Sequence, residues 1–165
     1  MQLPESVTLE IDHWLTKFPA DQRRSAVIAG LLKAQEHNNG WLSDEIMKAV
    51  ADYLIIPAVE VFEVATFYDM FELQPIGKHK ISLCTNISCM LRGSKQVEEA
   101  LVEKLGVGFG ETTADGQFTL RESECLGACA NAPVCMVDNS CYYEDLTPEK
   151  MLVLLQELDQ GVVDG

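Results

Sequence analysis

The chain has 165 residues, of which 47% are hydrophobic, and its formal net charge is −14 at pH 7. Length and composition predict one or two small globular domains and exclude a disordered chain. The charge argues against nucleic acid as a partner, because phosphate contacts need clustered basic side chains that the sequence lacks. It favours either solubility alone or docking to a basic protein.

Targeting signals are not evident in the sequence. No apolar run approaches the roughly 20 residues that a membrane-spanning helix needs, so we expect no direct membrane insertion. The start, Met1 to Glu5, lacks the basic residues and apolar core of a signal peptide. Six cysteines without such a signal indicate a reducing compartment, where thiolates bind metal more often than they form disulfides. We therefore expect a cytoplasmic protein.

Residues 1–75 predict helices and no strong strand. Asp21 is the expected N-cap of the second helix, which ends at residues 38–40. Ser43 is expected to cap the third helix, and Pro57 suits the first turn of the fourth. The apolar residues expected on the buried faces are, in chain order, Val7, Ile11, Trp14, Leu15, Phe18, Val27, Ile28, Leu31, Leu32, Met47, Val50, Ala51, Leu54, Val61, Val64 and Ala65.

Residues 76–165 predict strands alternating with helices. The predicted strands are one with Ile81 and Leu83, one with Phe118 and Leu120, one after Pro133 and a hairpin partner at 141–143. Helices are expected from about residue 94 and from Thr147. Their expected buried residues are Val97, Ala100, Leu101, Leu105, Met151, Leu154, Leu155 and Leu158. We predict an α+β chain, with a helical domain at 1–75 and a thioredoxin-like α/β domain at 76–165 that holds every cysteine.

Two cysteine pairs in the second domain predict a metal centre. They are Cys84-x4-Cys89 and Cys125-x3-Cys129, separated by thirty-five residues. The favoured occupant is one [2Fe-2S] cluster, with the first pair on one iron and the second pair on the other. The residues between the ligands are small, so backbone N–H groups can approach the sulfurs; they are Thr85, Asn86, Ser88, Gly127 and Ala128.

Other chemistries fit the cysteines less well. A structural zinc ion also binds four cysteines arranged in two pairs, so zinc remains an alternative. In that case the metal would only stabilise the fold of a small assembly module. Thiol–disulfide exchange normally needs Cys-x-x-Cys, which is absent. A Rieske centre needs histidine ligands, and none of His13, His37 or His79 lies beside a cysteine; we assign them to the surface or to packing. Cys135 and Cys141 are assigned to packing in apolar strands.

The sequence offers no nucleotide site and no catalytic residues of its own. The glycines of residues 106–110 follow a predicted helix and lack the G-x-G-x-x-G spacing, so they indicate a helix stop. The glutamates are scattered over helix surfaces, and no general acid–base pair stands out. We therefore expect that the chain does not bind NADH or flavin unaided.

The cysteine pattern and its neighbours resemble a known family, the 24 kDa subunit of respiratory NADH:quinone oxidoreductase (complex I). The matching residues extend from about residue 20 to the last helix. They are Val64-Ala65-Thr66-Phe67-Tyr68, Gly77-Lys78-His79, Cys84-Thr85-Asn86, Leu91-Arg92-Gly93, Gly110-Glu111-Thr112-Thr113, Glu124-Cys125-Leu126-Gly127-Ala128-Cys129, Asn131-Ala132-Pro133 and Tyr142-Tyr143-Glu144-Asp145-Leu146-Thr147. The chain departs from family members with methionines after Ala-Pro, since it has Val134-Cys135-Met136.

The resemblance implies a helical domain and a thioredoxin-like domain with one [2Fe-2S] cluster on Cys84, Cys89, Cys125 and Cys129. It implies packing against the flavin- and NADH-binding subunit, which carries FMN and NADH, and against other peripheral-arm subunits. Single electrons would then pass between flavin and cluster. A bacterial chain of this kind would lie at the inner face of the plasma membrane through its complex. The equivalent subunit of an NAD-linked hydrogenase or formate dehydrogenase stays an alternative.

Overall fold

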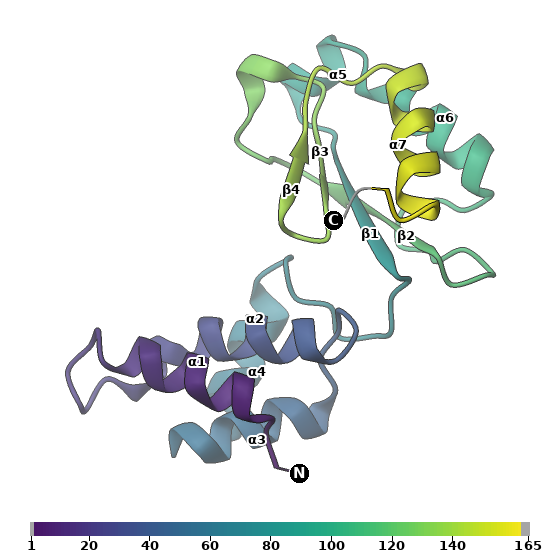
Figure 1. Cartoon of the computed structure of the whole chain (residues 1–165). Coiled ribbons are helices and arrows are strands. Elements are labelled where there is room, and N and C mark those ends of the chain that lie inside the picture. Colours follow the sequence, from purple (N-terminus) through teal and green to yellow (C-terminus); the bar gives the residue numbers. More distant parts are fainter. Residues whose placement is uncertain (1, 163–165) are drawn as a thin grey trace. The chain divides into compact units, whose positions relative to one another are not determined.

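The computed structural model describes residues 2–162 and divides the chain into two compact units, Met1–Pro75 and Ile76–Gly165 (Figure 1). The first unit is helical, and the second contains a sheet covered by helices. Within the described residues, no helix is both long and apolar enough to cross a bilayer.

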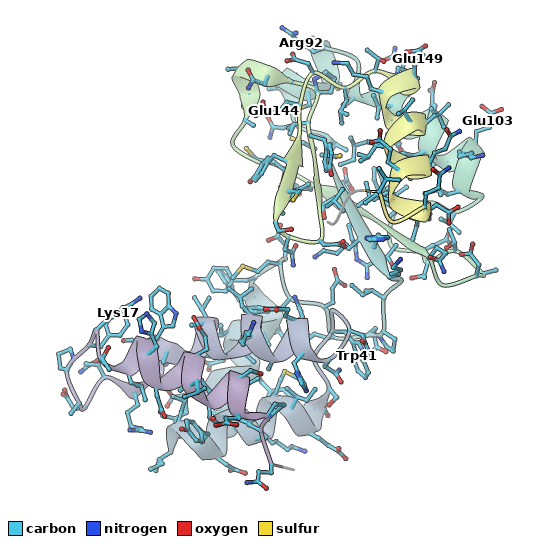
Figure 2. All side chains as sticks on the ribbon, viewed as in Figure 1. Lys17, Trp41, Arg92, Glu103, Glu144 and Glu149 are labelled. Carbon is cyan, nitrogen blue, oxygen red and sulfur yellow. The ribbon has the colours of Figure 1, made fainter. Side chains whose placement is uncertain are left out.

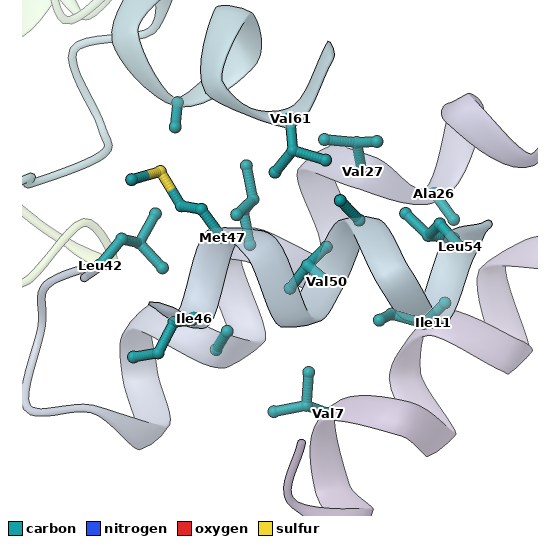
Figure 3. Packing of buried hydrophobic residues seen from close by; sticks show 14 of the residues in the cluster. Val7, Ile11, Ala26, Val27, Leu42, Ile46, Met47, Val50, Leu54 and Val61 are labelled. Carbon is teal, nitrogen blue, oxygen red and sulfur yellow. The ribbon is translucent and has the colours of Figure 1, made fainter. Parts of the chain in front are cut away.

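The first unit is built from amphipathic helices around one apolar core. Its elements are α1 (Glu5–Leu15), the 3-10 helix η1 (Arg23–Ala26), α2 (Val27–His37), α3 (Asp44–Leu54) and α4 (Ala58–Phe67). Figure 3 shows side chains from several helices, among them Val7, Val50 and Val61, meeting in this core. The prediction for Ser43 is confirmed, since its hydroxyl accepts a hydrogen bond from Ile46 N at 3.3 Å at the start of α3.

Several predictions for the first unit are wrong. Residues 23–26 form η1 with Gln22 at its N-cap, so Asp21 caps no helix. Ile28 and Leu32 are 37% and 38% exposed. The reason lies at Gly30, where an added Cβ would lie 2.8 Å from Ile11 Cγ1; α1 therefore packs onto the Gly30 side of α2.

The helical spacing also predicts a buried Phe18, and this prediction is wrong. Phe18 lies beyond the end of α1 and is 36% exposed. Its ring stacks on Trp14 with centroids 6.5 Å apart, and Lys17 Nζ lies 3.8 Å from the Trp14 ring centroid. The helix ends before a further turn can carry Phe18 into the core.

The second unit is a mixed sheet with helices. Its elements are β1 (His79–Cys84), α5 (Ile87–Leu91), α6 (Ser94–Leu105), β2 (Phe118–Ser123), the 3-10 helix η2 (Cys129–Asn131), β3 (Cys135–Val137), β4 (Cys141–Tyr143) and α7 (Pro148–Asp159). The strand order is β2-β1-β3-β4, with β1 parallel to β2 and antiparallel to β3. The helices α6 and α7 lie side by side (Figure 1).

The predicted strands and the last helix of this unit are confirmed. Thr147 caps α7 by accepting a hydrogen bond from Lys150 N at 3.3 Å. The core joins the sheet to α6 and α7. Its fully or nearly fully buried members are Ile81, Leu83, Val97, Leu101, Leu120, Cys135, Val137, Met151, Leu154, Leu155 and Leu158. The short helix α5 was not predicted.

Candidate metal centre

The two cysteine pairs follow adjacent parallel strands. Cys84 is the last residue of β1 and lies opposite Ser123, the last residue of β2. Thr85 N continues this pairing by donating to Ser123 O at 3.0 Å. Since the carboxyl ends of parallel strands meet at the same edge of a sheet, Cys84 and Cys125 leave the sheet at one edge. The topology therefore brings together two segments that are far apart in sequence.

The first pair is buried. Cys84 and Cys89 are 2% and 1% exposed and pack with Ala132 and Val134. Burial, assisted by a hydrogen bond with Cys84, raises the pKa of Cys89 to about 11, although a backbone hydrogen bond from Val134 acts in the opposite direction. Both cysteines are free thiols, and a metal that binds Cys89 must displace its proton.

The second pair lies on an exposed loop. Cys125 and Cys129 are both exposed. Gly127, whose φ is 74°, donates its N–H to Cys125 Sγ at 3.4 Å. A backbone donor of this kind stabilises a thiolate, and a residue with a side chain rarely adopts this conformation. The far end of the loop is tied down by Asp145 N, which donates to Asn131 O at 2.8 Å.

The four predicted ligands are brought together in part. Cys84 and Cys89 lie in one apolar cluster, and Leu126 and Ala128 from the second cysteine segment pack against that cluster. Across residues 2–162, no three His, Cys, Asp or Glu side chains converge closely enough to hold one ion. The donor set, two pairs of free thiols at one sheet edge, supplies the four thiolates that either a [2Fe-2S] cluster or a structural zinc ion takes.

The remaining predicted candidates lie elsewhere. Cys135 is fully buried in β3, and Cys141 is partly exposed in β4. His79, at the opposite end of β1 from Cys84, is buried with Nδ1 2.8 Å from Asp138 Oδ2. His13 and His37 are exposed. These positions agree with the packing and surface roles expected for them.

We expect Cys135 to resist alkylation in the native protein. Burial raises its pKa from 9.0 to about 12, which lowers the thiolate fraction at pH 8 by about a thousandfold. Iodoacetamide labelling followed by peptide mass spectrometry should modify Cys141 readily and Cys135 only after guanidinium unfolding. Equal labelling of the two thiols in native protein would show that Cys135 is not held in a closed core.

Comparison with known proteins gives consistent similarities. The sequence model of the thioredoxin-like [2Fe-2S] ferredoxin family matches residues 11–159. The E subunit of NADH-quinone oxidoreductase from Rickettsia bellii (strain RML369-C) is 47% identical over 144 residues, which cover 87% of this chain and 86% of the relative. The same subunit from Rickettsia conorii (strain ATCC VR-613 / Malish 7) is 46% identical, with the same coverage.

One solved structure shares the fold of most of the chain. It is a crystal structure of an NAD+-reducing [NiFe]-hydrogenase in the air-oxidized state, with a TM-score of 0.68 and 19% sequence identity. The match covers 81% of this chain but only 23% of the hydrogenase chain. At this identity the likeness concerns the fold alone.

Proposed function

The chain belongs to the thioredoxin-like [2Fe-2S] ferredoxin family, and we propose that it is the iron–sulfur electron-transfer subunit of an NADH-quinone oxidoreductase. The family match confirms the resemblance drawn from the motifs and the prediction of an α+β chain with a thioredoxin-like second part. The observation that carries the proposal is the placement of both cysteine pairs at one edge of the sheet, in a chain 47% identical to an NADH-quinone oxidoreductase subunit over 87% of its length.

The proposed ligands are Cys84 and Cys89 for one iron and Cys125 and Cys129 for the other. When bound, a [2Fe-2S] cluster supplies a centre that accepts and releases one electron at a time. The chain's own residues provide four thiol donors, the Gly127 N–H directed at Cys125 Sγ, and an apolar wall of Ala132 and Val134 beside the first pair. Backbone donors and burial of this kind are the means by which a protein adjusts a reduction potential.

We place NADH and FMN on a partner, the flavin- and NADH-binding subunit of the same complex. The glycines that most resemble a nucleotide loop support this, because Gly106 ends α6 with φ 71° instead of opening a helix after a strand. The function of this chain is then to dock on that subunit and exchange single electrons with its flavin. Through that complex it would lie at the inner face of a bacterial plasma membrane, with other peripheral-arm subunits.

Reduction by NADH should require the partner. We expect the anaerobically purified chain to contain iron and acid-labile sulfide without stoichiometric zinc, and to be bleached by dithionite but not by NADH. Adding the flavin- and NADH-binding subunit should make NADH effective, as followed by visible absorbance and low-temperature EPR. A zinc-loaded, colourless protein would overturn the electron-transfer role, and bleaching of the isolated chain by NADH would overturn the placement of flavin on the partner.

A further inference from the structure

The helix α5 exposes an apolar face beside the candidate metal centre. Ile87, Met90 and Leu91 are 58%, 49% and 77% exposed. Their spacing of i, i+3 and i+4 places them on one side of the helix. Cys89, on the same helix, is 1% exposed. A surface helix normally turns such an apolar stripe toward the core, whereas α5 turns it toward solvent.

The helix α5 lies at the end of the sheet where the two cysteine segments leave β1 and β2 (Figure 1). Cys89 belongs to α5 and lies in an apolar cluster against which Leu126 and Ala128, the residues between the second pair of cysteines, also pack. Cys125 and Cys129 are themselves exposed. A protein that approaches the metal centre closely enough for electron transfer therefore covers the surface next to α5.

Acidic side chains lie at both ends of the apolar face. Thr85, which precedes α5, donates its hydroxyl to Glu122 Oε1 at 2.8 Å. Arg92, which follows α5, has Nη2 3.6 Å from Asp145 Oδ1. Figure 2 shows Arg92 and Glu144 at this end of the second unit. Lys150 Nζ also donates to Asp145 O at 2.7 Å, so the rim holds three acids, Glu122, Glu144 and Asp145, against two bases, Arg92 and Lys150. The face thus combines an apolar centre with a rim of small net negative charge.

We propose that the exposed face of α5, formed by Ile87, Met90 and Leu91, is the docking surface for the flavin-carrying protein, which presents an apolar groove with a basic rim. The inference rests on the proposed function, because it assumes that electrons are exchanged at the cysteine site. Apolar side chains desolvated at the middle of an interface supply most of its binding energy. Complementary charges around them set orientation and association rate.

The acidic rim disfavours two other occupants. A second copy of this chain, whose net charge is −14, would bring acidic surfaces together. An anionic lipid surface attracts basic segments and would repel this rim. A basic protein surface is the occupant that satisfies both the apolar centre and its charges.

Serine substitutions on the face test the proposal in the full-length holoprotein. The probe is the flavin- and NADH-binding subunit of the same NADH-quinone oxidoreductase, titrated to obtain Kd. We expect Ile87→Ser and Leu91→Ser each to weaken binding by about tenfold, and to slow NADH-driven bleaching at subsaturating partner, while the EPR signal of the dithionite-reduced protein is retained. Val153→Ser is the control, because Val153 is an apolar residue of another helix, α7, with a similar exposure of 52%, and its replacement should leave Kd unchanged.

A double Ile87→Ser, Leu91→Ser variant that keeps its EPR signal and binds with wild-type Kd would overturn the docking surface alone. Absence of iron and sulfide from the wild-type protein would instead overturn the proposed function. The wild-type protein gives a second measurement, because its association rate should fall with added salt, and a salt-independent rate would refute the basic rim. Dimerisation abolished by Leu91→Ser, or flotation with anionic vesicles, would assign the face to another occupant.

Discussion

Replacing Cys129 with alanine is expected to remove most of the iron and acid-labile sulfide from the purified protein. Mutating a residue that only supports a metal ligand already lowers metal affinity by about 10–100-fold. Loss of a ligand itself should therefore leave about a tenth or less of the wild-type iron content. Cys129 is exposed, so its truncation opens no cavity in the core. The variant should therefore stay folded apart from the cysteine loops, and its loss of iron can be attributed to the missing thiol.

Cys141→Ser is the matched control for this substitution. Cys141 lies in the same unit and is partly exposed, but it belongs to neither predicted pair. Iron analysis, sulfide analysis and far-UV circular dichroism should show full cluster content and wild-type secondary structure. Cys84 and Cys89 are poorer first choices, because both are buried and their truncation adds a packing defect. A Cys129→Ala protein with full iron content and an unchanged spectrum would remove Cys129 from the ligand set.

The sequence predicts which segments carry the candidate site but not how far each cysteine is exposed. The spacing in each cysteine pair and the strands before Cys84 and Cys125 were sufficient to expect two segments and a metal. Burial depends on what packs over the loops, and Ala132 and Val134 cover Cys84 and Cys89 from more than forty residues further along the chain. No local pattern reports such a contact.

The helix α5 shows a second limit of periodicity. It has only five residues, too few for a recurring apolar position to define a helical period. Its apolar residues face solvent, which reverses the rule by which amphipathic helices are recognised. From the sequence alone, a segment with these two properties gives no helical signal.

The end of α3 depends on a contact distant in sequence. Ile55 adopts φ 55° at the C-cap, a left-handed conformation that glycine or asparagine usually supplies. Arg23 stabilises this helix end, since its Nε and Nη2 donate to Leu54 O at 2.6 Å and Tyr53 O at 3.2 Å. These bonds satisfy carbonyls that the helix leaves unpaired. Local sequence preferences do not foresee an isoleucine held this way by an arginine.

Gly77→Ala is expected to destabilise the second unit by about 2–3 kcal/mol, within the range for overpacking a close contact. A Cβ on Gly77 would lie 2.9 Å from both the backbone C and the backbone N of Phe118, at the start of β2. Gly77 N donates to the buried Thr119 Oγ1 at 2.7 Å, and Lys78 N donates to Gly116 O at 2.9 Å. The added methyl group must therefore push the amino ends of β1 and β2 apart and strain these bonds.

The rate at which Cys135 is alkylated measures this effect, because Cys135 is buried in the core of the same unit while both tryptophans lie in the first. A loss of about 2 kcal/mol should speed labelling by about thirtyfold, if the opening equilibrium limits access. Gly116→Asn separates steric contact from backbone conformation: Gly116 has φ 71° and nothing within 4 Å of an added Cβ, and asparagine tolerates that conformation. It should leave the labelling rate within about twofold of wild type, since its cost is a few tenths of a kcal/mol. If Cys135 is labelled no faster in Gly77→Ala than in Gly116→Asn, then β1 and β2 can separate at no cost in stability. The close approach at Gly77 would then not stabilise this edge of the sheet.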